Sequence, residues 1–123
     1  MNTVNVKISA RIYKDDERVF GPGTATLLRY INEMHSIRTA AKAMFMAYSK
    51  AWEVIRRAEK SLGFPLLERT RGGKNGGGAV LTEKGLLLLQ SYDDYCKEIA
   101  DFSAKYSDTM INLINNAREK TET

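Results

Sequence analysis

The N-terminal part of the chain alternates apolar and polar residues. Apolar side chains stand at every second position from Val4 to Ile12, which predicts a β-strand with one buried face. The polar run over residues 14–18 predicts a turn, and Val19 and Phe20 can pair back onto the first strand. The beginning of the chain is therefore expected to form a β-hairpin.

The next segment changes to the three- and four-residue spacing of apolar side chains that is typical of amphipathic helices. Thr24 and Ser36 are suitable N-caps for two helices, and Gly63, with Pro65 after it, is placed to end a third. The second helix contains three alanines, which are small enough to let a neighbouring helix approach closely. The predicted helices span residues 24–35, 37–45 and 48–62.

A glycine-rich cationic segment follows the helices. Residues 70–82 hold five glycines, two cations and one amide, with no acid, and apolar stretches flank the glycines. This pattern predicts a second β-hairpin, because glycine takes positive φ at little cost and lets a backbone approach another surface. Arg71 and Lys74 carry charge suited to phosphate. By itself the segment fits a phosphate cradle or a flexible wing, but a Walker loop would need the lysine at the start of a helix.

The last part of the sequence predicts one long helix, from Glu83 to about Asn115, with Thr82 as its N-cap. Its apolar positions alternate spacings of three and four residues, as in the seam of a coiled coil. Because such a helix is too long for one small core, the seam is expected to pair with a second copy; packing on its own domain is the alternative. The expected dimer-interface residues are Leu89, Tyr92, Cys96, Ile99, Phe102, Tyr106, Met110 and Leu113.

Three helices followed by a hairpin predict a winged helix-turn-helix, so the expected fold class is mainly α, of the α+β type. The N-terminal hairpin and the long C-terminal helix complete this architecture. The expected domains are a winged helix-turn-helix over residues 1–82, with its wing at about 66–81, and a dimerisation helix over residues 83–123. In this fold the second helix braces the third, which lies in the major groove of DNA.

Charge is unevenly distributed along the chain. Residues 36–82 carry nine cations and three anions, whereas residues 83–123 carry five cations and eight anions. The positive block favours a polyanionic partner such as nucleic acid, although a solvated helix face is a simpler explanation of charge alone.

The composition also argues against several function classes. One cysteine, Cys96, and one histidine, His35, leave no internal disulfide and no metal cluster, and no cofactor is expected. The sequence contains no carboxylate pair and no nucleophile–base set of the kind that would indicate an enzyme. The N-terminus lacks an apolar signal core and no run is long enough to span a membrane, so a soluble cytoplasmic protein is expected.

Residues 36–92 resemble the N-terminal DNA-binding domain of the ModE family of molybdate-responsive repressors, within the LysR-type winged-helix group. The matching pieces are Ser36-Ile37, Ala40-Ala41, Tyr48-Ser49-Lys50-Ala51-Trp52, Glu68-Arg69, Gly72-Gly73-Lys74, Gly76 to Thr82, Gly85 and Tyr92. The resemblance implies that the protein binds double-stranded DNA. ModE proteins continue into molybdate-binding domains for which a chain ending at Thr123 has no room, so no molybdate response is expected. This chain also has Ala47 where the family often has serine, which removes a helix cap and a possible phosphate contact.

The start of the third helix faces base edges and phosphates in a winged helix-turn-helix. Alternatives remain open there: Tyr48 is equally able to pack, and Glu53 to form an ion pair with Arg56 or Arg57. Trp52 is expected to be a core residue. The expected DNA-contacting residues are Ser36, Arg38, Tyr48, Ser49, Lys50, Glu53, Arg71, Lys74 and Asn75.

The leading hypothesis is a sequence-specific transcriptional regulator that binds a pseudo-palindromic operator as a homodimer. Its two recognition helices would lie about one DNA turn, ~34 Å, apart. The alternatives are a winged-helix protein-interaction module and a non-specific, nucleoid-type DNA binder. A steep dependence of binding on salt would distinguish a DNA-binding protein from a protein-binding module.

Overall fold

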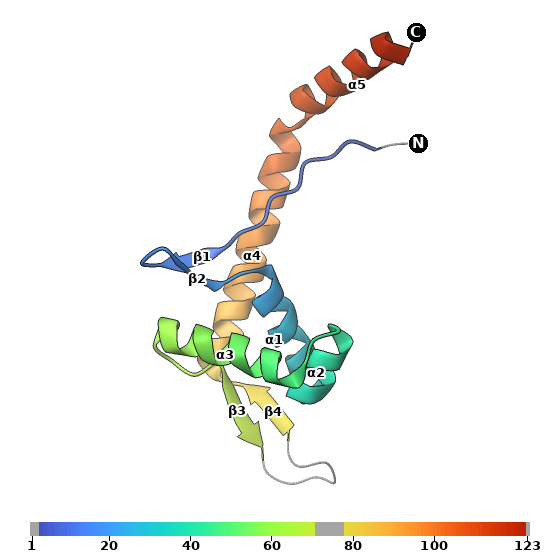
Figure 1. The fold of residues 1–123 in the computed structure, drawn as a ribbon. Helices are drawn as coiled ribbons and strands as arrows, with labels where there is room; N and C mark the ends of the chain where they lie inside the picture. Colours follow the sequence, from blue (N-terminus) through green and yellow to red (C-terminus); the bar gives the residue numbers. More distant parts are fainter. Residues whose placement is uncertain (1–2, 71–77, 123) are drawn as a thin grey trace. The chain divides into compact units, whose positions relative to one another are not determined.

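The computed structural model describes the backbone of residues 3–70 and 78–122 (Figure 1). Contacts divide the chain into two compact units: residues 10–92, the winged-helix unit, and residues 1–9 together with 93–123, the C-terminal unit. The elements in chain order are β1 (Ile12–Lys14), β2 (Glu17–Phe20), α1 (Pro22–Met34), α2 (Ile37–Ala43), α3 (Tyr48–Leu62), β3 (Leu67–Thr70), β4 (Gly78–Leu81), α4 (Glu83–Tyr106) and α5 (Asp108–Glu122).

The N-terminal hairpin consists of β1 and β2, which pair antiparallel. Asp15 and Asp16 form its two-residue loop and both take positive φ, 51° and 64°, as the twist of tight hairpins favours. The predicted first strand is wrong before Ile12, because residues 3–11 are not in a strand. Alternation satisfies one condition for a strand, but a strand also needs a hydrogen-bonding neighbour, and no described strand pairs with this segment.

Local capping explains where the first two helices begin. α1 starts at Pro22 with Gly21 as its N-cap, so the prediction that Thr24 caps this helix is wrong; the φ of proline already suits the first helical position. Ser36 caps α2 as predicted, since its Oγ accepts a hydrogen bond from the backbone N–H of Thr39 at 3.1 Å.

The third helix has the predicted bounds, and Gly63 ends it with a φ of 86°. Its N-cap residue, Ala47, makes no side-chain hydrogen bond to the first turn. The sequence predicts that Ala47 removes a helix cap, and the structure confirms this.

The second helix ends at Ala43, earlier than predicted, because Phe45 in the following turn takes a φ of 54°. This left-handed conformation is unfavourable for a bulky residue, and the side chain is 100% exposed. Phe45→Asn is therefore expected to raise the free energy of unfolding by about 1 kcal/mol, because asparagine tolerates the conformation and no packing is lost. Urea unfolding measures the change.

Phe45→Leu is the matched control, since leucine keeps both the exposure and the unfavourable φ; we expect it to leave the free energy of unfolding nearly unchanged. If Phe45→Asn lowered stability instead, the phenylalanine ring would have to gain packing that a single copy of the chain does not provide.

The core of the winged-helix unit joins α1, α2, α3 and β4. Three alanines on α2 and α3, Ala40, Ala41 and Ala51, are almost fully buried, and their size lets the two helices of the helix-turn-helix pack closely. The core cluster consists of Leu27, Ile31, Ile37, Ala40, Ala41, Ala51, Ile55 and Ala79. Tyr48 and Trp52 pack against it while remaining half-buried, so the expected core position of Trp52 is confirmed in part.

Glu59, on α3, has a structural role at the entry to the wing. Its Oε2 accepts hydrogen bonds from the backbone N–H groups of Leu66 at 2.7 Å and Leu67 at 3.4 Å. We expect Glu59→Ala to lower the free energy of unfolding by about 1–3 kcal/mol, because it leaves a part-buried donor without a partner. Glu59→Gln keeps an acceptor oxygen and is expected to cost less. Equal losses in urea unfolding for both variants would contradict this role.

The wing strands β3 and β4 pair antiparallel, with Thr70 opposite Gly78, which confirms the two predicted strands. The backbone N–H of Ala79 donates to the carbonyl oxygen of His35 at 3.0 Å, so the wing is tied to the C-terminal end of α1. The predicted DNA-contacting residues of the segment that joins β3 to β4, Arg71, Lys74 and Asn75, lie outside the described residues.

The beginning of α4 is anchored at Thr82, whose Oγ1 accepts from the N–H of Gly85 at 2.9 Å and donates to the carbonyl oxygen of Pro65 at 2.7 Å. The predicted N-cap is therefore confirmed. The same side chain links the end of β4 to the turn that precedes β3.

The first turns of α4 belong to the winged-helix unit. Leu89 and Tyr92 are buried; the hydroxyl of Tyr92 donates to the carbonyl oxygen of Ala10 at 2.8 Å, and its ring lies edge-on to Phe20 with 5.1 Å between centroids. The expectation that these two residues form a dimer interface is corrected, because the core already covers them. The chain accordingly divides at residue 92, whereas the expected boundary lies at residue 82.

The predicted long last helix is confirmed, but it is interrupted at Ser107, which separates α4 from α5. The backbone N–H groups of Ser107 and Ile111 still donate to the carbonyls four residues earlier, at 2.9 and 3.0 Å. The chain thus bends at Ser107, and these two hydrogen bonds bridge the bend. Apolar spacing does not detect such a bend, since it continues unchanged through Ser107.

The C-terminal unit buries no large apolar side chain among its described residues; Ser107 is the one buried residue there. Cys96 and Ile99 are half-buried. The remaining large side chains of the predicted seam, Phe102, Tyr106, Met110 and Leu113, are exposed.

The elements of the described residues confirm the predicted fold class, a mainly α winged helix-turn-helix of the α+β type with an N-terminal hairpin. No helix within residues 3–70 and 78–122 is both long enough and apolar enough to cross a membrane.

Candidate nucleic-acid interface

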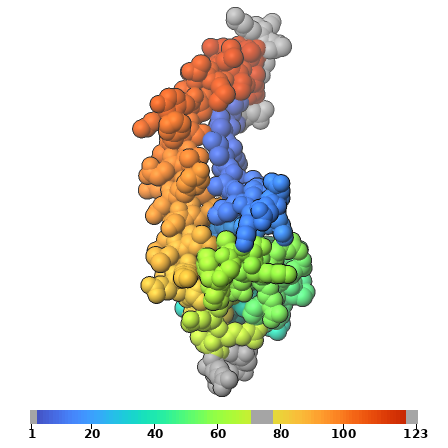
Figure 2. Space-filling view, turned by 90° about the vertical axis from the view of Figure 1, so that its left-hand side faces the viewer, coloured from blue at the N-terminus to red at the C-terminus, as the bar shows by residue number. Residues whose placement is uncertain are grey.

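The third helix presents one buried and one exposed face. Ala51, Ile55 and Ala58 point into the core, which leaves the opposite side of α3 in solvent. Ser49 and Lys50 are exposed on that side, in the first turn, as the winged helix-turn-helix fold predicts. Figure 2 shows α3, in green, at the surface next to the N-terminal hairpin, in blue.

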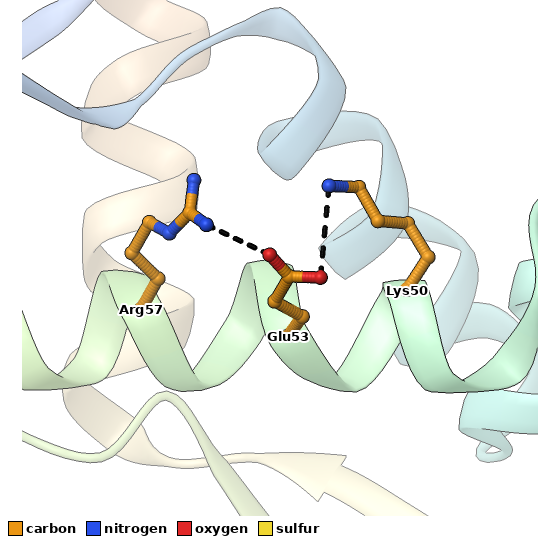
Figure 3. A network of polar contacts seen from close by, with 3 residues as sticks. All are labelled: Lys50, Glu53 and Arg57. Carbon is orange, nitrogen blue, oxygen red and sulfur yellow. Dashed lines mark hydrogen bonds and ion pairs between the residues drawn. The ribbon is translucent and has the colours of Figure 1, made fainter.

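Glu53 lies between two cations on the exposed side of α3 (Figure 3). Its carboxylate is 2.7 Å from Nη2 of Arg57 and 3.7 Å from Nζ of Lys50. The ion-pair alternative for Glu53 is therefore confirmed, with Arg57 and not with Arg56. An exposed pair of this kind contributes only about 0.3–0.5 kcal/mol. Lys50, whose contact with Glu53 is the longer of the two, can therefore exchange Glu53 for another anion at little cost.

Tyr48 lies at the centre of a second group of polar and aromatic contacts. Arg38, from α2, is 4.3 Å above the centre of the Tyr48 ring, and Nη2 of Arg69, from β3, donates to the Tyr48 hydroxyl at 3.3 Å. Hydrogen bonding with Trp52, together with the positive charge of Arg69 and Arg38, lowers the pKa of Tyr48. The alternative that Tyr48 packs is confirmed, since it also contacts the core.

Trp52 contacts Arg69 as well, together with one further arginine, Arg56. The guanidinium carbon of Arg69 lies 4.5 Å from the centre of the indole and that of Arg56 lies 5.1 Å from it, while Tyr48 is packed edge-on at 6.4 Å. Such cation–π contacts contribute about 0.5–1 kcal/mol at exposed sites. We call Arg38, Tyr48, Trp52, Arg56 and Arg69 the arginine–aromatic cluster; it joins α2, α3 and the wing.

The charges of this cluster are not neutralised by acids in the described part of the chain. Arg38, Arg56 and Arg69 form no ion pair with any described carboxylate, whereas Lys50 and Arg57 share Glu53. The three arginines therefore present positive charge to solvent from three different elements. Such a surface suits a polyanion.

Sequence reasoning did not select Arg56 and Arg69 as site residues. Arg56 could have been found from its position one helical turn after Trp52, which puts both on one side of α3. Arg69 has no such signal, because only the packing of the wing against α3 brings it to the indole.

The predicted residues of α2 are placed as follows. The Ser36 hydroxyl accepts from the N–H of Thr39, so its capping role is confirmed, and Arg38 is exposed and stacked on Tyr48. Arg71, Lys74 and Asn75 of the predicted wing contacts lie outside the described residues.

A hollow of about 600 Å³ lies between the N-terminal hairpin and α3. Its lining carries both signs of charge, so it attracts an anion less than the arginine–aromatic cluster does. Within the described ranges, no three histidine, cysteine or acidic side chains are grouped as metal ligands. The lining residues of the hollow are Lys14, Asp15, Glu17, Glu53, Arg56, Arg57, Lys60 and Ser61.

Comparison with known proteins shows which family the chain belongs to. The family model for bacterial regulatory helix-turn-helix proteins, lysR family, matches residues 25–86. The transcriptional regulator ModE of Haemophilus influenzae is 39% identical over 90 residues, which make up 73% of this chain and 33% of that protein. The DNA-binding transcriptional dual regulator ModE of Escherichia coli is 36% identical over 90 residues, 73% of this chain and 32% of that protein.

The molybdenum-pterin-binding protein MopB of Rhodobacter capsulatus is 36% identical over 72 residues, 58% of this chain and 27% of that protein. The chain thus spans about a third of the length of the curated ModE relatives, 33% and 32% for the two described above.

The matched segment runs from α1 through α3 and the wing strands to the start of α4, so it contains the exposed face of α3 and the arginine–aromatic cluster. The resemblance to ModE is confirmed by the identities above, and the ModE relatives are transcriptional regulators, not enzymes. The chain belongs to the lysR family of bacterial regulatory helix-turn-helix proteins and carries a DNA-binding helix-turn-helix of the LysR/ModE type.

Proposed function

We propose that this protein is a sequence-specific transcriptional regulator that binds a pseudo-palindromic operator as a homodimer. The observation that carries the proposal is the exposed cationic side of α3, which lies inside the segment matched by the family. The protein would act in the cytoplasm, where it meets DNA.

The proposed contacts follow the usual placement of a winged helix on DNA. The first turn of α3 enters the major groove, where Ser49 and Lys50 reach base edges. Lys50 leaves Glu53 when it binds, since their exposed pair is weak. Backbone phosphates position the protein without carrying sequence information. The phosphate-contacting residues in this proposal are Ser36, Arg38, Arg71, Lys74 and Asn75.

In this proposal the main role of Tyr48 and Glu53 is to position neighbouring cations, and direct contact with bases is secondary. Tyr48 holds Arg38 and Arg69 in place, and Glu53 sets the positions of Lys50 and Arg57 in the free protein. In the bound protein Glu53 could also accept a hydrogen bond from the amino group of cytosine.

The proposed dimer rests on the surface of the C-terminal unit. Its described residues bury no large apolar side chain, yet burial of apolar surface is the main force that stabilises a compact unit. A second copy of the same seam would supply that burial, and an isologous pairing would give two-fold symmetry. The proposed interface leaves out Leu89 and Tyr92 because they are buried. It consists of Cys96, Ile99, Phe102, Tyr106, Met110 and Leu113.

The first experiment is selection of bound genomic fragments by the purified chain at low and moderate salt. A two-fold-related motif with half-sites about one turn, ~34 Å, apart would support the proposal. Salt-sensitive binding without a motif would indicate a nucleoid-type DNA binder. Absence of binding at both salt concentrations would exclude the regulator proposal and favour a protein-interaction module. Because all proposed contacts lie in the winged helix, binding is expected without added molybdate.

A further inference from the structure

We infer that Arg56 and Arg69 form a phosphate-binding site for the DNA backbone, built on the indole of Trp52 at the junction of α3 and the wing. The inference rests on the proposed function and deepens it, because it assigns to the interface two contacts and one positioning residue beyond the first turn of α3.

Two consecutive elements, α3 and β3, converge at this site. Arg56 follows Trp52 on α3, whereas Arg69 comes from β3, yet their guanidinium carbons lie 5.1 and 4.5 Å from the centre of the same indole ring. The two guanidinium carbons are thus held within 9.6 Å of one another, the sum of these two distances, although their charges repel. An anion that both can contact relieves this repulsion, and a phosphodiester has two charged oxygens that accept hydrogen bonds.

The charges at this site remain available to a ligand. Neither arginine forms an ion pair with a described carboxylate, and both residues are exposed. Arg57, the neighbour of Arg56 on α3, differs in this respect because Glu53 lies 2.7 Å from it. A guanidinium that contacts an aromatic face keeps its in-plane N–H groups free to donate, so stacking on Trp52 does not consume the donors that phosphate needs.

Trp52 acts here as a positioning residue. An unstacked arginine samples many rotamers and loses that freedom when it binds phosphate. The indole limits the freedom of both arginines before DNA arrives, and its half-buried ring is itself held by Tyr48 and the core. Pre-organisation of this kind increases affinity by lowering the cost of binding.

The test measures the anisotropy of a labelled DNA duplex over a series of salt concentrations. Arg56→Gln and Arg69→Gln are each expected to weaken binding to specific and non-specific duplexes alike, and to reduce the slope of log affinity against log salt by about one. Arg57→Gln is the matched control, as an exposed cation on the same helix that already has an acid partner; its slope is expected to stay unchanged. Equal loss of slope in all three variants would overturn the assignment.

Positioning by Trp52 is tested by two substitutions. Trp52→Leu is expected to reduce the salt slope by about two, as loss of both phosphate contacts would, while Trp52→Phe, which keeps an aromatic face, restores most of it. Melting temperature is measured alongside, because a purely structural role would lower stability without changing the slope of the folded protein. An unchanged slope in folded Trp52→Leu would contradict the inference.

Trp52 is also the one tryptophan of the chain, so its fluorescence reports directly on the site. We expect DNA to protect it from quenching by iodide, an anion that the two arginines attract in the free protein. If wild-type protein binds the duplex but quenching and both arginine slopes are unaffected, the inference fails and the proposed function stands. If wild-type protein binds no DNA, the proposed function itself fails.

Discussion

Gly85→Ala is expected to lower the free energy of unfolding by about 3 kcal/mol, which shifts the melting temperature of a domain of this size by more than about 10 °C. A Cβ at this position would lie 2.4 Å from the carbonyl oxygen of Leu66 and 3.1 Å from Oγ1 of Thr82. The closer atom belongs to the backbone, so it cannot move away by a rotamer change. The same oxygen accepts the hydrogen bond of the Thr82 N–H.

The loss should spread from the start of α4 to the wing. Thr82 bonds both to Gly85 and to Pro65, so any movement that relieves the clash also disturbs the turn before β3. We therefore expect reduced amide-exchange protection in β3 and β4 as well as in the first turn of α4. Calorimetry gives the size of the effect and hydrogen exchange its location.

Gly23→Ala is the matched control for this substitution. An added Cβ at Gly23 meets nothing within 4 Å, and the residue lies in the first turn of α1. Alanine has the higher helix propensity, so a gain of up to about 1 kcal/mol is expected. A tolerated Gly85→Ala, with a melting temperature near that of Gly23→Ala, would mean that α4 and the wing approach less closely than described.

The second large effect concerns the proposed dimer. Tyr106→Glu is expected to raise the dimer dissociation constant at least about 30-fold, because it places a charge in the centre of an apolar seam, where loss of a central aromatic residue costs about 2 kcal/mol or more. The side chain is 67% exposed in a single copy, so the substitution removes little packing within the chain. Sedimentation equilibrium measures the association.

Operator binding should fall together with dimerisation, since each copy contacts one half-site. Lys105→Glu tests whether charge alone explains the result: it adds a carboxylate at the adjacent exposed position, outside the seam, and is expected to leave the dimer intact. A Tyr106→Glu protein that remains dimeric and binds its operator would exclude the seam as the interface. Dissociation by both variants would point to a general charge effect on α4.

Much of the fold could be predicted from local signals. Ser36 caps α2 and Gly63 ends α3 in the predicted way, because a cap depends on a few neighbouring residues and their φ angles. The strand from Val4 failed for the opposite reason: alternation describes one chain segment, whereas a strand exists only with a partner. The bend at Ser107 could not be predicted, because the apolar spacing is the same on both sides of it.

The same distinction between local signals and tertiary contacts applies to the residues of the candidate site. Ser49 and Lys50 could be placed at the start of a solvent-facing helix because helical periodicity alone identifies its exposed side. Glu53 and its cations also lie at helical spacing, which is why their ion pairs were an open alternative. Arg69 could not be assigned from the sequence, since it reaches Trp52 only where the wing packs on α3.

The sequence by itself therefore determined the class of the protein: a cationic winged helix-turn-helix with a glycine-rich wing and an apolar seam, each specified by composition, spacing and motif. Only the tertiary structure decided which apolar residues the core covers and which cations lack an acid partner. Leu89 and Tyr92 became core residues, while Arg56 and Arg69 converged on one indole. Burial and charge pairing depend on what lies nearby in space, and distance along the chain does not determine that.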